Sequence, residues 1–224
     1  SDAHAVFVSD IDNDGHADII TANYSPGTVS VLKNIGDGTF GTPANYQVGV
    51  YPEAVFVYDL NGDGFGDIVT ANSGETQGPD GISVLINNGD GTFAPKIAYA
   101  MRATPMSVFV NDVDGNGYGD IVVGDWNAVS SMINDGNGNF SYNWEFYGDR
   151  PVQSLFLSDL DGDGKGDLAT VHSTNPNDVS ILKNNGDGSF SISGHYYFAS
   201  GPKSVAINDI DGDGDGDLAI VLST

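Results

Sequence analysis

The chain has 224 residues, of which 31 are Asp or Glu and only 7 are Lys or Arg, so its formal net charge is −24. A surface this acidic repels nucleic acid and anionic membranes, and we expect no nucleic-acid partner. The sequence contains no cysteine, which excludes disulfides, and no apolar run long enough for membrane insertion.

Short apolar runs rich in β-branched and aromatic residues follow one another along the chain. In the first unit they occupy residues 5–8, 19–22 and 29–32, with a weaker run at 45–48, and similar runs recur in the later units. Such runs, bounded by clusters of Gly, Asp and Asn, are typical of β-strands. No stretch has a sustained helical period, so the sequence predicts an all-β fold.

A nine-residue acidic loop separates the first and second strands of each unit, with the pattern Asp-x-[Asp/Asn]-x-[Asp/Asn]-Gly-x-x-Asp. Its five copies begin 49, 53, 47 and 50 residues apart, and Asp fills 18 of the 20 oxygen-bearing positions 1, 3, 5 and 9. The pattern matches the start of an EF-hand-type calcium loop. The predicted side-chain ligands are Asp10, Asp12, Asp14, Asp18, Asp59, Asn61, Asp63, Asp67, Asp112, Asp114, Asn116, Asp120, Asp159, Asp161, Asp163, Asp167, Asp209, Asp211, Asp213 and Asp217.

Calcium takes six to eight oxygen ligands, so a backbone carbonyl at position 7 is expected to join the side chains. The residues there are His16, Phe65, Tyr118, Lys165 and Asp215. Without a cation the loop would be a strongly self-repelling acidic turn, which we regard as the weaker alternative. We expect about five Ca²⁺, one for each loop. The two loops in which Asn replaces a carboxylate should bind more weakly.

A second motif, Gly-[Asp/Asn]-Gly-x-Phe, follows the third strand of the first four units at residues 36–40, 89–93, 136–140 and 186–190. Asp-Gly and Asn-Gly accept the positive φ values of a tight hairpin. We expect the Phe side chain to fold back and plug the blade, so that its ring is buried. A metal role for Asp37, Asp90 or Asp187 is the alternative.

Four strands in each unit of ~50 residues are typical of a β-propeller blade. The acidic loops, the Gly-[Asp/Asn]-Gly-x-Phe turns and the Pro-x-x-Val segments at Pro52, Pro105 and Pro202 resemble the FG-GAP/VCBS repeat family, whose propellers include the head of integrin α-subunits. The resemblance implies one repeat domain with a calcium loop between the first two strands of each blade. The expected blades are residues 1–49, 50–102, 103–149, 150–200 and an incomplete 201–224.

Alternating strand direction places the acidic loops at one end of the blades and the more varied connections at the other. Ligand-binding residues usually lie on such varied connections. The third unit carries Trp126 and Trp144, which could form a glycan platform, although aromatic side chains between blades are more often core. The Asn-x-Ser patterns at Asn23 and Asn139 leave glycosylation open.

The sequence favours a secreted or cell-surface, non-catalytic module that binds a glycan or an extracellular protein, because such calcium loops fill where calcium is millimolar. No nucleophile motif is present. Only His172 and His195 could approach each other, and we regard a catalytic role for them as the much weaker alternative. Two alternatives remain open, a structural subunit that self-assembles through an open strand edge near residues 218–222, and the non-catalytic propeller of a secreted polysaccharide-active enzyme.

Overall fold

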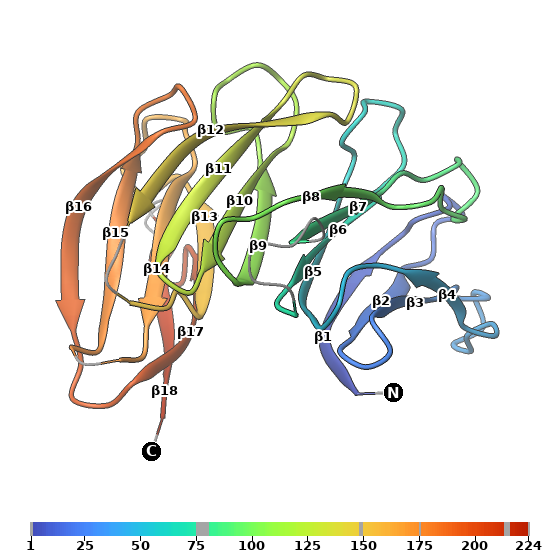
Figure 1. The fold of residues 1–224 in the computed structure, drawn as a ribbon, viewed down its shortest axis with the longest axis horizontal. Coiled ribbons are helices and arrows are strands. Elements are labelled where there is room, and N and C mark those ends of the chain that lie inside the picture. The colour runs from blue at the N-terminus through green and yellow to red at the C-terminus, as the bar shows by residue number, and fades with distance from the viewer. Residues whose placement is uncertain (1, 75–80, 148–149, 175, 213–215, 224) are drawn as a thin grey trace. The chain divides into compact units, whose positions relative to one another are not determined.

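The computed structural model describes residues 2–74, 81–147, 150–174, 176–212 and 216–223. Within these residues the secondary structure consists of β-strands, which form four sheets of four antiparallel strands and one sheet of two (Figure 1). The prediction of an all-β fold with four-stranded repeats is therefore confirmed. Among the described residues, no helix has the length and hydropathy needed to cross a membrane.

Each sheet is a meander in which neighbouring strands in the sequence pair with each other. We call the sheets blades 1 to 4 and the two-stranded sheet the half-blade. Blade 1 contains β1 (Ala3–Ser9), β2 (Asp18–Asn23), β3 (Thr28–Leu32) and β4 (Ala44–Gln47). Blade 2 contains β5 (Pro52–Tyr58), β6 (Asp67–Asn72), β7 (Ile82–Leu85) and β8 (Ile97–Tyr99).

The later sheets repeat this order with longer outer strands. Blade 3 contains β9 (Pro105–Asn111), β10 (Asp120–Asp125), β11 (Ala128–Asn134) and β12 (Phe140–Tyr147). Blade 4 contains β13 (Ser154–Ser158), β14 (Asp167–His172), β15 (Asp178–Asn184) and β16 (Phe190–Tyr197). The half-blade contains β17 (Pro202–Asn208) and β18 (Asp217–Leu222).

The chain forms two compact units, residues 1–108 with 136–138, and residues 109–135 with 139–224. In the first unit, Ile20, Val31 and Ile68 belong to one buried cluster shared by blades 1 and 2. In the second unit, Val122 and Leu168 belong to a cluster shared by blades 3 and 4. Each core therefore forms between blades, as expected for units too small to bury a core alone.

Aromatic side chains of one blade pack against those of the next within each unit. The Phe93 ring lies 5.2 Å from Tyr46 of blade 1, edge to face, and the Phe190 ring lies 5.5 Å from Trp144 of blade 3. Phe93, Phe140 and Phe190 are at most 9% exposed, which confirms the predicted plug in three blades. The prediction is wrong for Phe40, which is 40% exposed, because no aromatic ring of another blade packs against it among the described residues.

The two tryptophans lie in different environments. Trp144 in β12 is half-buried, packs against a buried cluster of the second unit and stacks on Phe146 with ring centroids 6.1 Å apart. Trp126 follows β10 in a short connection and is 59% exposed. The geometry therefore makes Trp144 a packing residue and leaves Trp126 accessible.

Replacing each tryptophan by alanine should lower the free energy of unfolding by different amounts and so distinguish the two environments. Trp144→Ala removes half-buried aromatic packing and should lower the free energy of unfolding by about 2 kcal/mol. Trp126→Ala should change it by less than about 0.5 kcal/mol, because the side chain is exposed. Urea unfolding in saturating calcium measures both, and equal losses would contradict this assignment.

Candidate metal-binding loops

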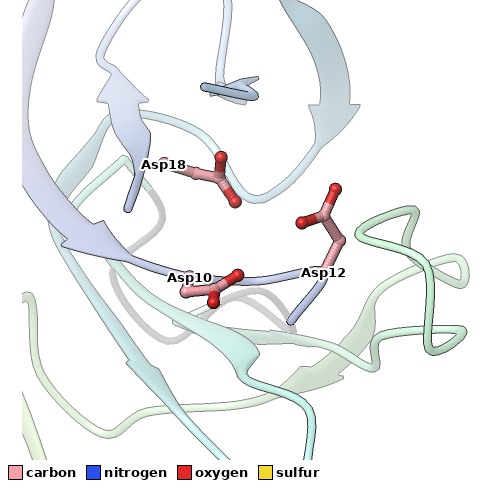
Figure 2. Close-up of side chains that lie close together, drawn as sticks. All are labelled: Asp10, Asp12 and Asp18. Carbon is pink, nitrogen blue, oxygen red and sulfur yellow. The ribbon is translucent and has the colours of Figure 1, made fainter. Parts of the chain in front are cut away.

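The acidic loops join the first and second strands of each sheet. Figure 2 shows that the carboxylates of Asp10, Asp12 and Asp18, at positions 1, 3 and 9, point toward one another. Three carboxylates from these positions lie with ligand atoms within 4.8 Å of one another in four of the five loops. These groups are Asp10, Asp12 and Asp18; Asp112, Asp114 and Asp120; Asp159, Asp161 and Asp167; and Asp209, Asp211 and Asp217.

This donor set fits a hard divalent cation, because carboxylate oxygens converge without nitrogen or sulfur ligands. The second loop carries Asn61 at position 3, where the other loops carry Asp, so its converging carboxylates are fewer. Asp213 and Asp215 of the fifth loop lie outside the described residues. The sequence-predicted positions 1, 3 and 9 are thus brought together in four loops.

The carboxylate at position 1 also organises the loop backbone. In the second loop, Asp59 Oδ1 accepts the Gly62 N–H at 2.8 Å, and Asp59 Oδ2 accepts the Gly64 N–H at 2.8 Å. Both glycines have positive φ, which turns their N–H groups inward. Asp112 and Asp159 make the same pair of bonds in the third and fourth loops.

The side chain at position 5 forms a local turn with position 7 in the four loops whose position 5 is described, and Asp14 and Asp163 do not belong to the carboxylate groups of their loops. In each of four loops its Oδ1 accepts the N–H of the position-7 residue. The four bonds are Asp14 with His16 at 2.8 Å, Asp63 with Phe65 at 2.9 Å, Asn116 with Tyr118 at 2.8 Å and Asp163 with Lys165 at 3.0 Å. Position 5 therefore shapes the backbone that carries the predicted carbonyl ligand.

In blades 1 to 4 the carboxylate at position 9 is buried and holds two parts of the blade together. Asp67 Oδ2 accepts the Leu60 N–H within the loop at 3.0 Å, and Oδ1 accepts the Asn87 N–H beyond the third strand at 2.8 Å. Asp18, Asp120 and Asp167 make the equivalent two bonds. Position 9 is therefore structural as well as a candidate ligand.

Burial raises the pKa of Asp67 and of Asp120 to about 6 from an ordinary value of 3.8. Desolvation outweighs the two N–H bonds that each carboxylate accepts, and the neighbouring loop carboxylates act in the same direction. Burial likewise raises the pKa of Asp167. A bound cation would oppose this effect by favouring the charged form.

An asparagine at the end of each third strand, or two residues beyond it, is an anchoring position that the sequence analysis missed. Asn87 is 3% exposed, and its Nδ2 donates to the Gly66 carbonyl at 3.0 Å and to the Ile11 carbonyl of the first loop at 2.8 Å. Its Oδ1 accepts the Gly89 N–H at 3.0 Å. The recurring pattern Asn-x-Gly-[Asp/Asn]-Gly could have identified this asparagine from the sequence. The equivalent residues are Asn34, Asn134 and Asn184.

The aspartates of the Gly-Asp-Gly turns are used within their own hairpins. Asp37 Oδ1 accepts both the N–H and the hydroxyl of Thr39, at 2.9 and 2.6 Å, and these bonds lower its pKa. Asp90 and Asp187 make the same contacts with Thr92 and Ser189. This geometry supports the structural interpretation of these residues over a metal role.

Two lysines, Lys33 directly after β3 and Lys183 in β15, lie against two of the acidic loops. Lys33 Nζ is 3.1 Å from Asp12 Oδ2, and Lys183 Nζ contacts Asp161 and lies 3.4 Å from Asp163. These ammonium groups offset part of the carboxylate repulsion. A divalent cation in the same loop would compete with them for Asp12 or Asp161.

Ser, His and Asp side chains also meet in blade 4, but not as a catalytic triad. Ser180 Oγ lies 2.9 Å and Asp178 Oδ2 3.1 Å from the same atom, His195 Nδ1, whereas a triad uses the two ring nitrogens separately. Asp178 is fully buried and also bonds Arg150. His172 lies near the cluster, and burial lowers its pKa. The cluster therefore fixes the start of β15.

Comparison with known proteins identifies the repeat. A family model described as FG-GAP-like repeat matches residues 10–70, 59–123, 112–170 and 159–220, and each match begins at an acidic loop. The chain belongs to the FG-GAP-like repeat family. No curated protein matches the chain at a significant level.

Several solved structures share this FG-GAP-like fold. A lectin of Agrocybe aegerita that recognises non-reducing terminal N-acetylglucosamine is 25% identical, with a TM-score of 0.65 over 96% of this chain and 59% of the lectin. BBS1N in complex with ARL6DN is 15% identical, with a TM-score of 0.64 over 98% of this chain and 62% of BBS1N. The Photorhabdus luminescens Tc holotoxin pore is 23% identical, with a TM-score of 0.53 over 96% of this chain and 10% of that one. The chain thus spans about three-fifths of the first two proteins.

Removing one buried asparagine should destabilise the FG-GAP repeats. Asn87→Ala leaves the buried Ile11 carbonyl and the partly buried Gly66 carbonyl without this donor, so the free energy of unfolding should fall by about 3 kcal/mol. Asn88→Ala is the matched control, because Asn88 is the exposed neighbour and bonds only Thr92 among the described residues. Urea unfolding compares them, and a loss at Asn87 no larger than at Asn88 would contradict the anchoring role.

Protons should compete with calcium at the second and third loops. The pKa of Asp67 and Asp120 is about 6 without metal, so calcium must displace bound protons below that pH. Affinity should therefore fall as pH drops from about 7 to about 5. The stability of the calcium-free chain should change with pH in the opposite direction. A carboxyl pKa that is higher in the folded than in the unfolded chain favours the protonated folded state, so in chelator the free energy of unfolding should rise as the pH falls from about 7 to about 5. Calorimetric titration across this range measures the affinity, and pH-independent binding at these loops would contradict the assignment.

Proposed function

We propose that this chain is a calcium-binding, extracellular recognition module that binds a glycan or an extracellular protein through its varied connections and has no catalytic role. The observation that carries the proposal is the contrast between the two ends of the blades. One end repeats the same acidic loop and hairpin, whereas the connections after the second strands differ in length and composition. A constant structural end and a varied opposite end are typical of binding proteins built on a rigid scaffold.

The convergence of carboxylates in four loops supports calcium as the ion. Calcium accepts the flexible, oxygen-only coordination that these loops offer, whereas magnesium requires near-octahedral geometry. Loops of this kind fill at the millimolar calcium found outside cells, which supports an extracellular location. About five ions would offset a large part of the net charge of −24.

Recognition is supported by the exposed side chains of the varied connections and by the structural neighbours. Trp126 is exposed beside Asn127, so an aromatic face and a polar group lie together. The similar lectin recognises a glycan, and BBS1N is complexed with a protein. We favour a glycan because the lectin has the higher sequence identity of the two.

Self-assembly is a second candidate function, and the half-blade favours it. Val221 and Leu222 in β18 are 60% and 44% exposed, and an apolar groove lined by Tyr196, Leu218 and Ile220 lies beside them. An apolar strand edge invites pairing with another strand. In this alternative the chain is a structural subunit of an extracellular assembly.

Calcium removal tests the structural half of the proposal. Excess chelator should lower the melting temperature sharply, because each independent site adds about 2.7 kcal/mol when free calcium is 100 times its dissociation constant. Magnesium in place of calcium is the control and should restore little of the loss. An unchanged melt in chelator would contradict the calcium proposal, and a glycan array with the calcium-loaded chain tests the recognition half.

A further inference from the structure

Three aromatic rings from separate segments form one continuous stack in the first unit. The His4 and Tyr24 rings lie 4.2 Å apart at an interplanar angle of 22°, and the Tyr24 and Tyr51 rings lie 4.4 Å apart at 10°. His4 comes from β1, Tyr24 from the β2–β3 connection and Tyr51 from the segment between blades 1 and 2. We call these three residues the aromatic stack. It lies at the end of blades 1 and 2 opposite the acidic loops.

Tyr51 has a backbone conformation that is costly for a large side chain. Its φ is +56°, in the left-handed region that glycine or asparagine adopts more easily. Tyr51 also precedes Pro52, whereas Thr104 and Gly201, the residues before the equivalent Pro105 and Pro202, are not among the positive-φ residues. Gly or Asn would relieve the strain but would lose the ring that stacks on Tyr24. Such strain is often kept where the side chain serves binding.

Hydrogen bonds hold the aromatic stack in place. Glu53 Oε2 lies 3.0 Å from His4 Nδ1, and Glu53 Oε1 accepts the Ser73 hydroxyl at 2.8 Å. The Ser73 N–H donates to the Tyr51 carbonyl at 2.9 Å. The position of the rings is therefore set before any ligand arrives, which lowers the ordering cost of binding.

The groups left for a ligand are two phenol rings, with the exposed Asp2 carboxylate 3.8 Å from His4 Nε2 at the far end of the stack. Tyr51 is 42% exposed, and neither Tyr24 nor Tyr51 uses its hydroxyl in a hydrogen bond among the described residues. Both oxygens of Glu53 are engaged by His4 and Ser73, so this carboxylate is not free to pair with a cation. An exposed ring face with phenol hydroxyls at its edge matches the apolar C–H face and peripheral hydroxyls of a pyranose.

We propose that the aromatic stack is a binding platform for a neutral sugar ring, which packs on Tyr51 and bonds the hydroxyls of Tyr51 and Tyr24. This inference rests on the proposed glycan recognition and gives it a site in blades 1 and 2 that does not include Trp126. The strained tyrosine is then retained for its ring, at a small cost in stability.

The variant Tyr51→Asn tests this platform, because Asn removes the ring and tolerates positive φ. A glycan array identifies the sugar bound by the calcium-loaded chain, and titration calorimetry then compares variants. Tyr51→Asn should weaken binding about tenfold or more while the melting temperature stays equal or rises. Tyr197→Asn, which removes a tyrosine that is 66% exposed in β16, is the matched control and should bind as the unaltered chain does.

Full binding by Tyr51→Asn would overturn the platform and leave glycan recognition standing, whereas absence of any bound glycan on the array would overturn both. A lower melting temperature with unchanged binding would make the aromatic stack a packing feature and would also overturn the proposal. If Tyr51→Asn fails to fold, NMR of the unaltered chain tests the proposal through the ring resonances of Tyr24 and Tyr51. They should shift when the sugar is added, and unshifted resonances would overturn the platform.

Discussion

Four of the five acidic loops bring three carboxylates together within nine residues, and the blades depend on accommodating them. Their mutual repulsion and the burial of the position-9 carboxylate both oppose folding, and the raised pKa of Asp67 and Asp120 reflects this cost. Backbone N–H groups and the lysines beside Asp12 and Asp161 offset part of it. A bound divalent cation would offset the rest. This constraint explains why one end of the blades is constant, while the other end is free to vary.

Features with local causes could be predicted from the sequence. The strands, the hairpins and the acidic loops each depend on residues within about ten positions of one another, and their repetition identified the blade. The spacing of Asp10, Asp12 and Asp18 was sufficient to place their carboxylates together. Position 5 was harder to predict, because its oxygen can serve either a metal or the position-7 N–H.

Features that depend on distant segments could not be predicted. Asn87 reaches the Ile11 carbonyl, 76 residues away, and its role is visible only when two blades are side by side. The aromatic stack joins residues from three segments, and the positive φ of Tyr51 has no signature in a Tyr-Pro dipeptide. Phe40 shares its motif with the three buried Phe residues, and the motif alone does not distinguish them.

The most direct test of this account is the number of calcium ions bound per chain, measured by native mass spectrometry. The account predicts about five ions, with Asp120→Asn losing the ion of its own loop because that carboxylate completes the converging group. A chain that binds no calcium, or an Asp120→Asn variant that binds as many ions as the unaltered chain, would contradict it.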